Sequence, residues 1–290
     1  MADWPLPSLK LFDQAASEGR AETKLEATNY WDQRAPSYHE RQSEGGNDDL
    51  HIKIIQALTR RTGLNASHRV LDIGCGPGRH SRLLAPIVGN VTAFDLSPTM
   101  IELAKTADFS LSQKIDFRVL DWDEADLGSL GWNNKFHLAL ASRTPAIHNL
   151  ASLKKMIQAV SEGGYGALVS AVETRHSLRD PLLERWSVDP EISRAVRSVY
   201  LEINMLWLLG FYPEVSYFDQ KWSASRSLAE AIYQQTRYLD RLILLSEDEK
   251  KFIAQSLTDL AHEGQVLEEV EAKTALVIWE IPPRLELEKS

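Results

Sequence analysis

A short apolar run that ends in a glycine-rich turn is the feature that most constrains this chain. Residues 68–80 read HRVLDIGCGPGRH, and Asp95 ends the next apolar run. A strand, a tight turn, a helix and a later carboxylate form the pattern of a site for a nucleoside-containing cofactor. Glycines let backbone N–H groups approach such a ligand, and the carboxylate accepts hydrogen bonds from ribose hydroxyls.

The glycine spacing distinguishes between cofactors. A dinucleotide-binding turn reads G-x-G-x-x-G, and its third glycine lets the helix pack closely on the strand. Here Arg79 stands at that third position, and Asp72, just before the turn, would repel a pyrophosphate. This pattern disfavours an NAD(P)-dependent oxidoreductase. A carboxylate at that place suits a ligand that carries an ammonium and a sulfonium.

Four motifs occur in order along the chain: residues 70–78 (VLDIGCGPG), 91–100 (VTAFDLSPTM), 115–122 (IDFRVLDW) and 136–149 (FHLALASRTPAIHN). Together they resemble the motifs of class I S-adenosylmethionine-dependent methyltransferases, of the small-molecule, UbiE-like (type 11) kind. The resemblance covers roughly residues 65–172, and an earlier segment, 30–38 (YWDQRAPSY), is similar to one that folds over the cofactor in that family. A surface helix is the alternative interpretation of this earlier segment.

The resemblance implies S-adenosylmethionine as cofactor and S-adenosylhomocysteine as product. In the family's pattern, Asp72 anchors the methionine ammonium, Asp95 takes the ribose hydroxyls and Asp121 accepts from the adenine amine. The full cofactor-binding set that it implies is Tyr30, Arg34, Tyr38, Asp72, Gly74, Cys75, Gly76, Pro77, Gly78, Asp95, Leu96, Met100, Asp121, Trp122 and Ser142. Ordinary core packing is the alternative for Met100 and Trp122.

Candidates for handling the methyl acceptor follow the fourth expected strand. His148 is the possible general base, because an imidazole titrates near neutral pH. Arg143 and Thr144 are expected to orient the substrate, and a contact of His148 with the next helix or a loop is the alternative. Lesser candidates for the base are His80, Glu173 and His176.

Apolar runs alternate with helical periodicity, which predicts an α/β fold with a doubly wound, Rossmann-like sheet. Seven strands, mostly parallel with an antiparallel last strand, and helical cap insertions are expected. Strands are predicted near residues 68–73, 90–95, 115–120, 136–142, 165–172, 212–222 and 272–281. Helices are predicted near residues 50–64, 78–88, 98–106, 150–161, 189–209 and 226–244, with further helix starts at Asp180-Pro181 and at the Ser246–Glu249 capping box.

The expected organisation is one compact domain in three parts. Residues 1–49 form an N-terminal helical segment over the cofactor site, with a loop at 44–49. Residues 50–174 form the cofactor-binding core, and 175–290 form the rest of the sheet with the cap. Gly163-Gly164 is expected to end one helix and open the next strand.

Composition narrows the class of partner. The net charge of −9 argues against nucleic-acid binding, because that binding needs a basic surface. The single cysteine, Cys75, fits a reducing, cytoplasmic location, and no apolar run is long enough to cross a membrane. Spacing typical of metal ligands is absent from the sequence, so no metal is expected.

The sequence therefore predicts a methyltransferase that acts on a small molecule by in-line displacement, as a monomer or homodimer. A non-catalytic S-adenosylmethionine-binding sensor or accessory protein stays open, because no indispensable catalytic residue is identifiable. A protein or RNA acceptor is disfavoured by the acidic charge.

Overall fold

The computed structural model describes residues 24–43, 48–106, 113–187 and 199–283, without the side chains of residues 33, 34, 36–43, 48 and 241. Its strands are β1 (Arg69–Ile73), β2 (Asn90–Asp95), β3 (Ile115–Val119), β4 (Phe136–Ser142), β5 (Val160–His176), β6 (Glu214–Ser227) and β7 (Gln265–Glu280). Its helices are α2 (Lys24–Ser43), α3 (Asp48–Thr62), α4 (Arg79–Leu84), α5 (Pro98–Thr106), α6 (Leu150–Ala159), α7 (Asp180–Arg185), α9 (Val199–Leu208), α10 (Leu228–Ile243) and α11 (Glu247–Leu260).

The seven strands form one sheet in the order β3-β2-β1-β4-β5-β7-β6. The pairs among β1 to β5 are parallel. Strand β7 runs antiparallel to β5, since Gly163 N donates to Ile281 O and Ser177 N donates to Glu269 O, so that one strand's numbers rise as the other's fall. The predicted α/β fold with a mostly parallel, seven-stranded sheet is confirmed.

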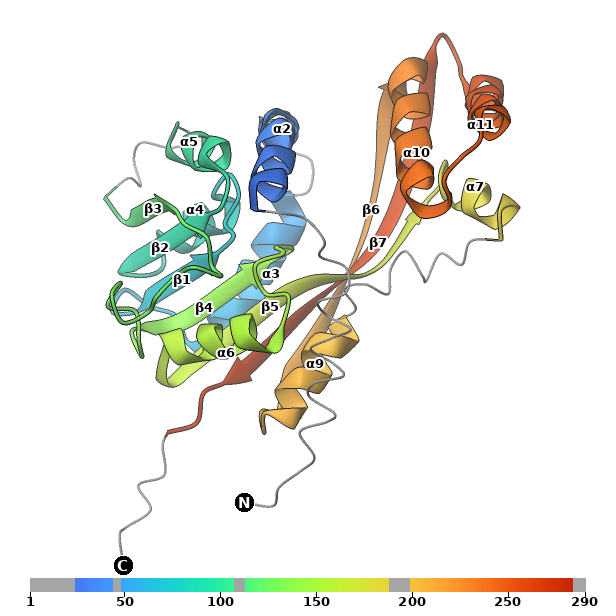
Figure 1. Ribbon diagram of the computed structural model, residues 1–290. Coiled ribbons are helices and arrows are strands. Elements are labelled where there is room, and N and C mark those ends of the chain that lie inside the picture. The colour runs from blue at the N-terminus through green and yellow to red at the C-terminus, as the bar shows by residue number, and fades with distance from the viewer. Residues whose placement is uncertain (1–23, 44–47, 107–112, 188–198, 284–290) are drawn as a thin grey trace, which may run out of the picture. The chain divides into compact units, whose positions relative to one another are not determined.

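Strands β1, β2 and β4 are short apolar runs whose residues are nearly all buried on both faces. Such runs are typical of parallel strands that are covered by helices on each side. In Figure 1, α6 lies in front of this part of the sheet and α3 lies behind it. This layering leaves the ends of the strands, and the loops that follow them, as the place for a ligand.

Two compact units can be distinguished. The first contains Met1–Ser170, Val199–Ser216 and Ala275–Ser290, and the second contains Ala171–Ser198 and Tyr217–Thr274. Strands β5, β6 and β7 each run from one unit into the other. The division at residues 49 and 174, and the single compact domain, remain predictions.

These three strands are longer than the sequence indicates, and β7 shows why. Residues 274–279 of β7 are buried without a break, whereas residues 265–272 alternate between exposed and buried positions. The first pattern is typical of a strand covered on both faces, and the second of a strand covered on one face. Glu268, Glu269 and Glu271 interrupt residues 265–272, so no apolar run marks this half of the strand.

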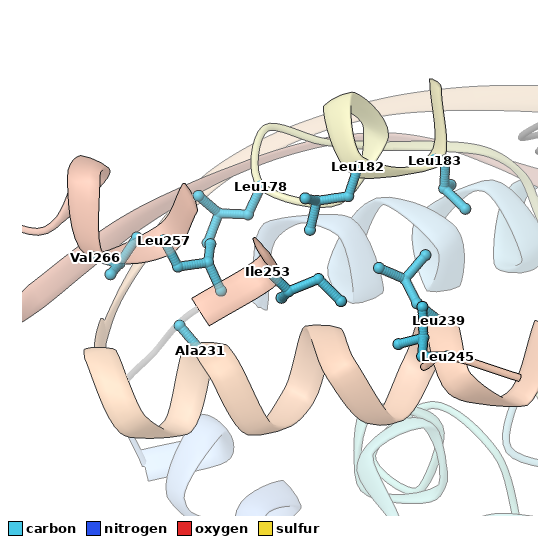
Figure 2. Packing of buried hydrophobic residues seen from close by; sticks show 9 residues of the cluster. All are labelled: Leu178, Leu182, Leu183, Ala231, Leu239, Leu245, Ile253, Leu257 and Val266. Atoms are coloured by element: carbon cyan, nitrogen blue, oxygen red, sulfur yellow. The ribbon is translucent and has the colours of Figure 1, made fainter. Parts of the chain in front are cut away.

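The second unit has its own hydrophobic core, in which helices α7, α10 and α11 pack together (Figure 2). Ser246 begins α11 with a capping box, as predicted, because its hydroxyl accepts from the Glu249 N–H while the Glu249 carboxylate accepts from the Ser246 N–H. The buried members of this core are Leu178, Leu182, Leu183, Ala231, Leu239, Leu245, Ile253, Leu257 and Val266.

Two sequence expectations differ from the structure, and a third lies partly outside the described residues. Helix α6 ends at Ala159, so Gly163 and Gly164 lie inside β5; a Cβ at Gly164 would stand 2.7 Å from the carbonyl oxygen of His137, and glycine permits this close approach. Helix α3 already begins at Asp48, inside the expected loop, whose residues 44–47 lie outside the described part. Of the helix expected over 189–209, residues 189–198 lie outside the described part, and the described remainder is α9, which agrees with the expectation. None of the described helices is long and apolar enough to cross a bilayer.

Candidate functional site

The glycine turn between β1 and α4 has a left-handed backbone at three positions. The φ angles of Gly74, Gly76 and Gly78 are 64°, 53° and 79°. A Cβ at Gly74 would stand 2.0 Å from Oγ1 of Thr144, so the loop after β4 packs directly on the turn. Both the backbone conformation and this contact require glycine at position 74.

Asp95, the last residue of β2, faces this turn. Its carboxylate accepts hydrogen bonds from Gly76 N at 2.8 Å and from Ser97 N at 2.9 Å. Burial raises the pKa of Asp95, and these backbone donors counteract that effect in part. A Cβ at Gly76 would meet no described atom within 4 Å, so there is open space beside the carboxylate. A fixed carboxylate beside open space at the turn fits the ribose portion of S-adenosylmethionine.

Asp72 lies beneath the turn and is almost completely buried, at 1% exposed. Ser81 donates its hydroxyl to the Asp72 carboxylate at 2.6 Å, which ties β1 to α4. Burial raises the pKa of Asp72 to about 6, against the lowering effect of the Ser81 hydrogen bond. Burial also raises the pKa of the neighbouring Cys75 thiol, so that this residue stays protonated near neutral pH. This agrees with a small packed side chain rather than a reactive thiolate.

The residues expected around adenine have different surroundings. Asp121 follows β3, and its carboxylate accepts from Asp123 N at 2.9 Å and lies 3.5 Å from Lys24 Nζ. Met100 is buried, whereas Leu96 is half-buried at the end of β2.

Trp122 is also buried; its ring stacks on Phe94 at 5.4 Å, and its indole N–H donates to the carbonyl of Ser152 at 3.2 Å. These contacts favour the core-packing alternative for Trp122.

The early segment lies on α2, next to α5 (Figure 1). The Asp32 carboxylate accepts from the Ser97 hydroxyl and from Thr99 N, so it stands at the beginning of α5, directly after Asp95. Tyr30 is half-buried, with its ring edge against Trp31. The side chains of Arg34 and Tyr38 lie outside the described part of the chain. Through Asp32, the early segment contacts Ser97 and Thr99 of the second motif. The sequence analysis did not single out Asp32 for this contact.

The loop after β4 holds the predicted acceptor residues. Ser142 pairs with Val169 of β5 and is half-buried. Arg143 has a φ of 49°, and its N–H donates to the Val169 carbonyl at 2.8 Å, so the chain turns sharply away from the sheet there. The Thr144 hydroxyl accepts from Ala146 N at 3.2 Å.

His148 lies at the beginning of α6. Its Nε2 is 2.9 Å from Nδ2 of Asn149 and 3.8 Å from a carboxylate oxygen of Asp123. The side chain that caps α6 is that of Asn149, whose oxygen accepts from Ser152 N at 2.7 Å. Capping therefore does not account for the His148 imidazole, although His148 N itself donates to the Ser152 hydroxyl.

A histidine that the sequence analysis missed contacts one of the lesser candidates. Nδ1 of His51, in α3, is 2.9 Å from Nε2 of His80, in α4. Burial, together with the charges of His80, Arg79 and Arg143, lowers the pKa of His51 to about 2. Burial, together with Arg143 and Arg79, lowers the pKa of His80 to about 4. Since α3 precedes every motif and places one histidine among ordinary surface residues, the sequence carries no signal that would find this pair.

Glu173 and His176, the other lesser candidates, belong to the second unit. Glu173 binds Arg175 at 2.7 Å, and Nδ1 of His176 is 3.0 Å from the buried carboxylate of Glu268. Within the described residues, no group of three or more histidine, cysteine, aspartate or glutamate side chains is arranged to hold a metal ion.

Comparison with known families identifies the part of the chain that carries this site. Residues 70–164 match the family model described as "Methyltransferase domain". These residues belong to the class I methyltransferase domain family. The methyltransferase domain begins in β1 and contains the glycine turn, Asp95 and the loop after β4. S-adenosylmethionine is the methyl donor typical of this family, which agrees with the cofactor expected from the sequence.

Curated relatives match only a short stretch. The "Ubiquinone biosynthesis O-methyltransferase" of Xanthomonas campestris pv. campestris (strain B100) is 41% identical over 51 residues, which are 18% of this chain and 21% of that protein. The protein of the same description from Xanthomonas oryzae pv. oryzae (strain PXO99A) is 41% identical over 54 residues, 19% of this chain and 23% of that protein. The matches thus span about a fifth of the length of these relatives.

Solved structures share the fold over most of the chain. The [4+2]-cyclase SpnF is 15% identical with a TM-score of 0.55, and the match covers 91% of this chain and 98% of that one. Phosphoethanolamine N-methyltransferase 2 of Haemonchus contortus, solved with S-adenosyl-L-methionine, is 15% identical with a TM-score of 0.52, over 94% of this chain and 60% of that one. At this level of identity the two structures support the fold alone.

Proposed function

We propose that the protein binds S-adenosylmethionine at the glycine turn and transfers its methyl group to a small-molecule acceptor by in-line displacement. The observation that carries the proposal is the geometry of Asp95. Its carboxylate is held by two backbone N–H groups beside the open space at Gly76. A carboxylate fixed in this way recognises a ribose diol without further rearrangement.

The cofactor, when bound, supplies a methyl group on a positively charged sulfur. The residues of the chain bind and orient it: Asp95 accepts from the ribose hydroxyls, Asp121 accepts from the adenine amine, and Asp72 provides negative charge near the ammonium. From the family resemblance, the segment that carries Tyr30, Arg34 and Tyr38 is proposed to fold over the cofactor. Orientation and exclusion of water account for most of the rate enhancement in reactions of this type.

On the acceptor side, His148 is the proposed general base, with Arg143 and Thr144 orienting the substrate. The position of Thr144 against Gly74 supports its assignment, because the side chain of Thr144 touches the cofactor turn. His148 is half-buried at the beginning of α6, close to the loop that carries Arg143 and Thr144, which supports its assignment to the acceptor side.

A small molecule is the proposed acceptor, since the acidic chain disfavours nucleic acid. The names of the Xanthomonas relatives describe O-methyltransferases of ubiquinone biosynthesis, which is consistent with a small acceptor. The name of SpnF describes a cyclase on the same fold, so methyl transfer has to be tested directly.

Calorimetric titration with S-adenosylmethionine, S-adenosylhomocysteine and NADH tests the proposal. We expect both adenosyl ligands to bind and NADH not to bind. The variant Asp95→Ala should lose this binding and Asp95→Asn should weaken it, whereas Asp116→Ala, an exposed carboxylate on β3, should leave it unchanged. Binding of NADH alone would overturn the proposal in favour of an oxidoreductase. Binding of the adenosyl ligands without turnover on a broad panel of acceptors would favour a non-catalytic sensor.

A further inference from the structure

Strand β6 forms one edge of the sheet, beside β7 (Figure 1). Among the residues that the structure describes, no strand pairs with the outer side of β6. An edge strand presents a row of backbone N–H and C=O groups on that side, and another strand can pair with them. Residues 217–227 of β6, here called the β6 edge, belong to the second unit.

Two ion pairs show how β6 lies against β7. Asp219 binds Lys273 at 2.6 Å, and Lys221 binds Glu271 at 3.0 Å. The residue number rises on β6 as it falls equally on β7, so the strands are antiparallel and the members of each pair lie opposite each other. At least 40% of each of the four side chains is exposed, so they stand on the face of the sheet that is open to solvent.

The other face of the β6 edge is only partly covered. Alternate residues from 218 to 226 lie on this face, and each of them is half-buried rather than buried. Val270 of β7, which lies opposite Trp222 in the same register, is only 2% exposed. The core of the second unit therefore covers β7 more completely than β6, and it leaves the rings of Phe218 and Trp222 partly exposed.

The residues of the β6 edge are arranged symmetrically about Gln220. Asp219 and Lys221 stand next to it on either side, and Phe218 and Trp222 follow one position further out. Side chains that lie opposite each other on neighbouring strands share a face of the sheet. Two copies of one strand that pair antiparallel about a twofold axis therefore have one residue opposite itself. With Gln220 at the axis, Asp219 lies opposite Lys221 of the second copy, and Phe218 lies opposite Trp222 of the second copy.

Other registers lose this match. With the axis at Asp219 or at Lys221, two like charges would lie directly opposite each other, which destabilises a strand pair. With the axis at Phe218 or at Trp222, both charged residues would lie opposite uncharged ones. The charges of the β6 edge therefore select the register that is centred on Gln220.

We propose that the β6 edge is a docking surface for a second copy of this chain, whose β6 pairs with it in the antiparallel register centred on Gln220. This pairing extends the ion pairs that each chain already has, so that charges of alternating sign form a row across four strands. One such row runs through Glu271 and Lys221, and then through Asp219 and Lys273 of the second copy. The twofold axis creates a second, identical row.

The backbone and the aromatic rings supply the affinity of this pairing. Main-chain hydrogen bonds hold a strand that is added to a sheet edge. The pairing also brings the ring of Phe218 against that of Trp222 of the second copy, and aromatic pairs on neighbouring strands stabilise a sheet. The docking goes beyond the proposed function and does not depend on methyl transfer, because no residue of the candidate cofactor site takes part in it.

Analytical ultracentrifugation of the full-length protein tests the proposal. We expect a dimer whose fraction rises with concentration. Asp219→Lys and Lys221→Asp each place like charges opposite each other on both sides of the axis, so each variant alone should dimerise about tenfold or more weakly. An equimolar mixture of the two variants should form a heterodimer and recover most of this loss, because every lysine then lies opposite an aspartate.

Asp248→Lys and Lys251→Asp are the matched controls. The two residues form an exposed ion pair on α11 at 2.9 Å, in the same unit as the β6 edge. Their reversal changes the net charge of the chain by the same amounts as the two test variants. Dimerisation should be unchanged in both controls.

Gln220→Cys reports the register. Opposite residues of antiparallel strands have Cα atoms about 4.5–5.5 Å apart, which is within the span of a disulfide. Under mild oxidation, Gln220→Cys should therefore form a covalent dimer. Ser223→Cys should not, because in the proposed register the two copies of residue 223 lie roughly 20 Å apart along the strands. Both variants keep Cys75, so a cross-link through that thiol would appear in both.

A protein that stays monomeric at about 100 µM, above the micromolar dissociation constants of weak interfaces, would overturn the proposal. A dimer that neither charge reversal weakens would also overturn it, because its interface would lie elsewhere. The same holds if the mixture of the two charge variants dimerises no better than each variant alone, or if Gln220→Cys forms no more covalent dimer than Ser223→Cys.

Discussion

Replacement of Gly74 by alanine should both strain the backbone and force two segments apart. A residue with a side chain at the observed φ of 64° costs about 1–2 kcal/mol. The new Cβ would also stand 2.0 Å from Oγ1 and 2.7 Å from Cβ of Thr144, and overpacking of this kind costs about 1–3 kcal/mol. Gly74→Ala should therefore lower the free energy of unfolding by about 2–5 kcal/mol.

Gly131→Ala is the matched control, because Gly131 has nearly the same φ, 63°, and a Cβ added there would meet no described atom within 4 Å. Urea denaturation followed by circular dichroism should give a cost of about 1–2 kcal/mol there. The difference between the two variants measures the contact with Thr144. The double variant Gly74→Ala/Thr144→Gly should recover that difference. Equal costs for Gly74→Ala and Gly131→Ala would refute the proposed packing of the loop on the turn.

Two further predictions concern the second unit. The pKa of Glu268 is lowered to about 2, because the hydrogen bonds from His176 and Arg226 outweigh the opposing effect of burial. The pKa is depressed in the folded state, so its contribution to stability is present above about pH 4.5 and lost as the pH falls towards 2. Glu268→Gln should lower the free energy of unfolding by about 3 kcal/mol at neutral pH and flatten its dependence on pH across this acid range, as measured by urea denaturation. If the stability of the variant fell with pH in parallel with that of the unchanged protein, the lowered pKa of Glu268 would be contradicted. Leu257 is buried in the core of α7, α10 and α11, so Leu257→Ala should lower the free energy of unfolding by about 2–5 kcal/mol. Leu260 lies in the same helix but is 60% exposed, so Leu260→Ala should cost less than about 1 kcal/mol in the same assay. Equal costs for the two variants would refute this core.

The parallel part of the fold could be predicted well because two sequence signals mark it: apolar runs for the strands and characteristic residues in the turns. Strands β1, β2 and β4 are buried on both faces and appear in the sequence as nearly continuous apolar runs. The glycine-rich turn after β1 and the carboxylate of Asp95 at the end of β2 mark where two of these strands end. The bounds predicted for them differ from the observed ones by one residue at most. The start of β7 had no such signal, because Glu268 occupies a buried position and is stabilised there by partners far away in the sequence.

The candidate site divides in the same way. The positions of Gly74 and Asp95 at one turn could be predicted, because backbone conformation and local spacing determine them. The packing of Thr144 on Gly74 and the contact of Asp32 with the start of α5 could not, because each depends on how two distant elements meet. His51 is the extreme case, since only the side-by-side position of α3 and α4 gives it a partner.

The change of burial pattern along β7 has a consequence for the evolution of this protein. Where residues 265–272 alternate between exposed and buried positions, the loss or gain of a single residue would turn every outward side chain inward. Inherited changes in the length of this half of the strand should therefore occur in steps of two residues. Strands β5 and β6 lie on either side of β7 and would have to change length with it. The match to the methyltransferase domain family ends at residue 164, so the matched residues could keep their register while such steps lengthened or shortened this half of β7.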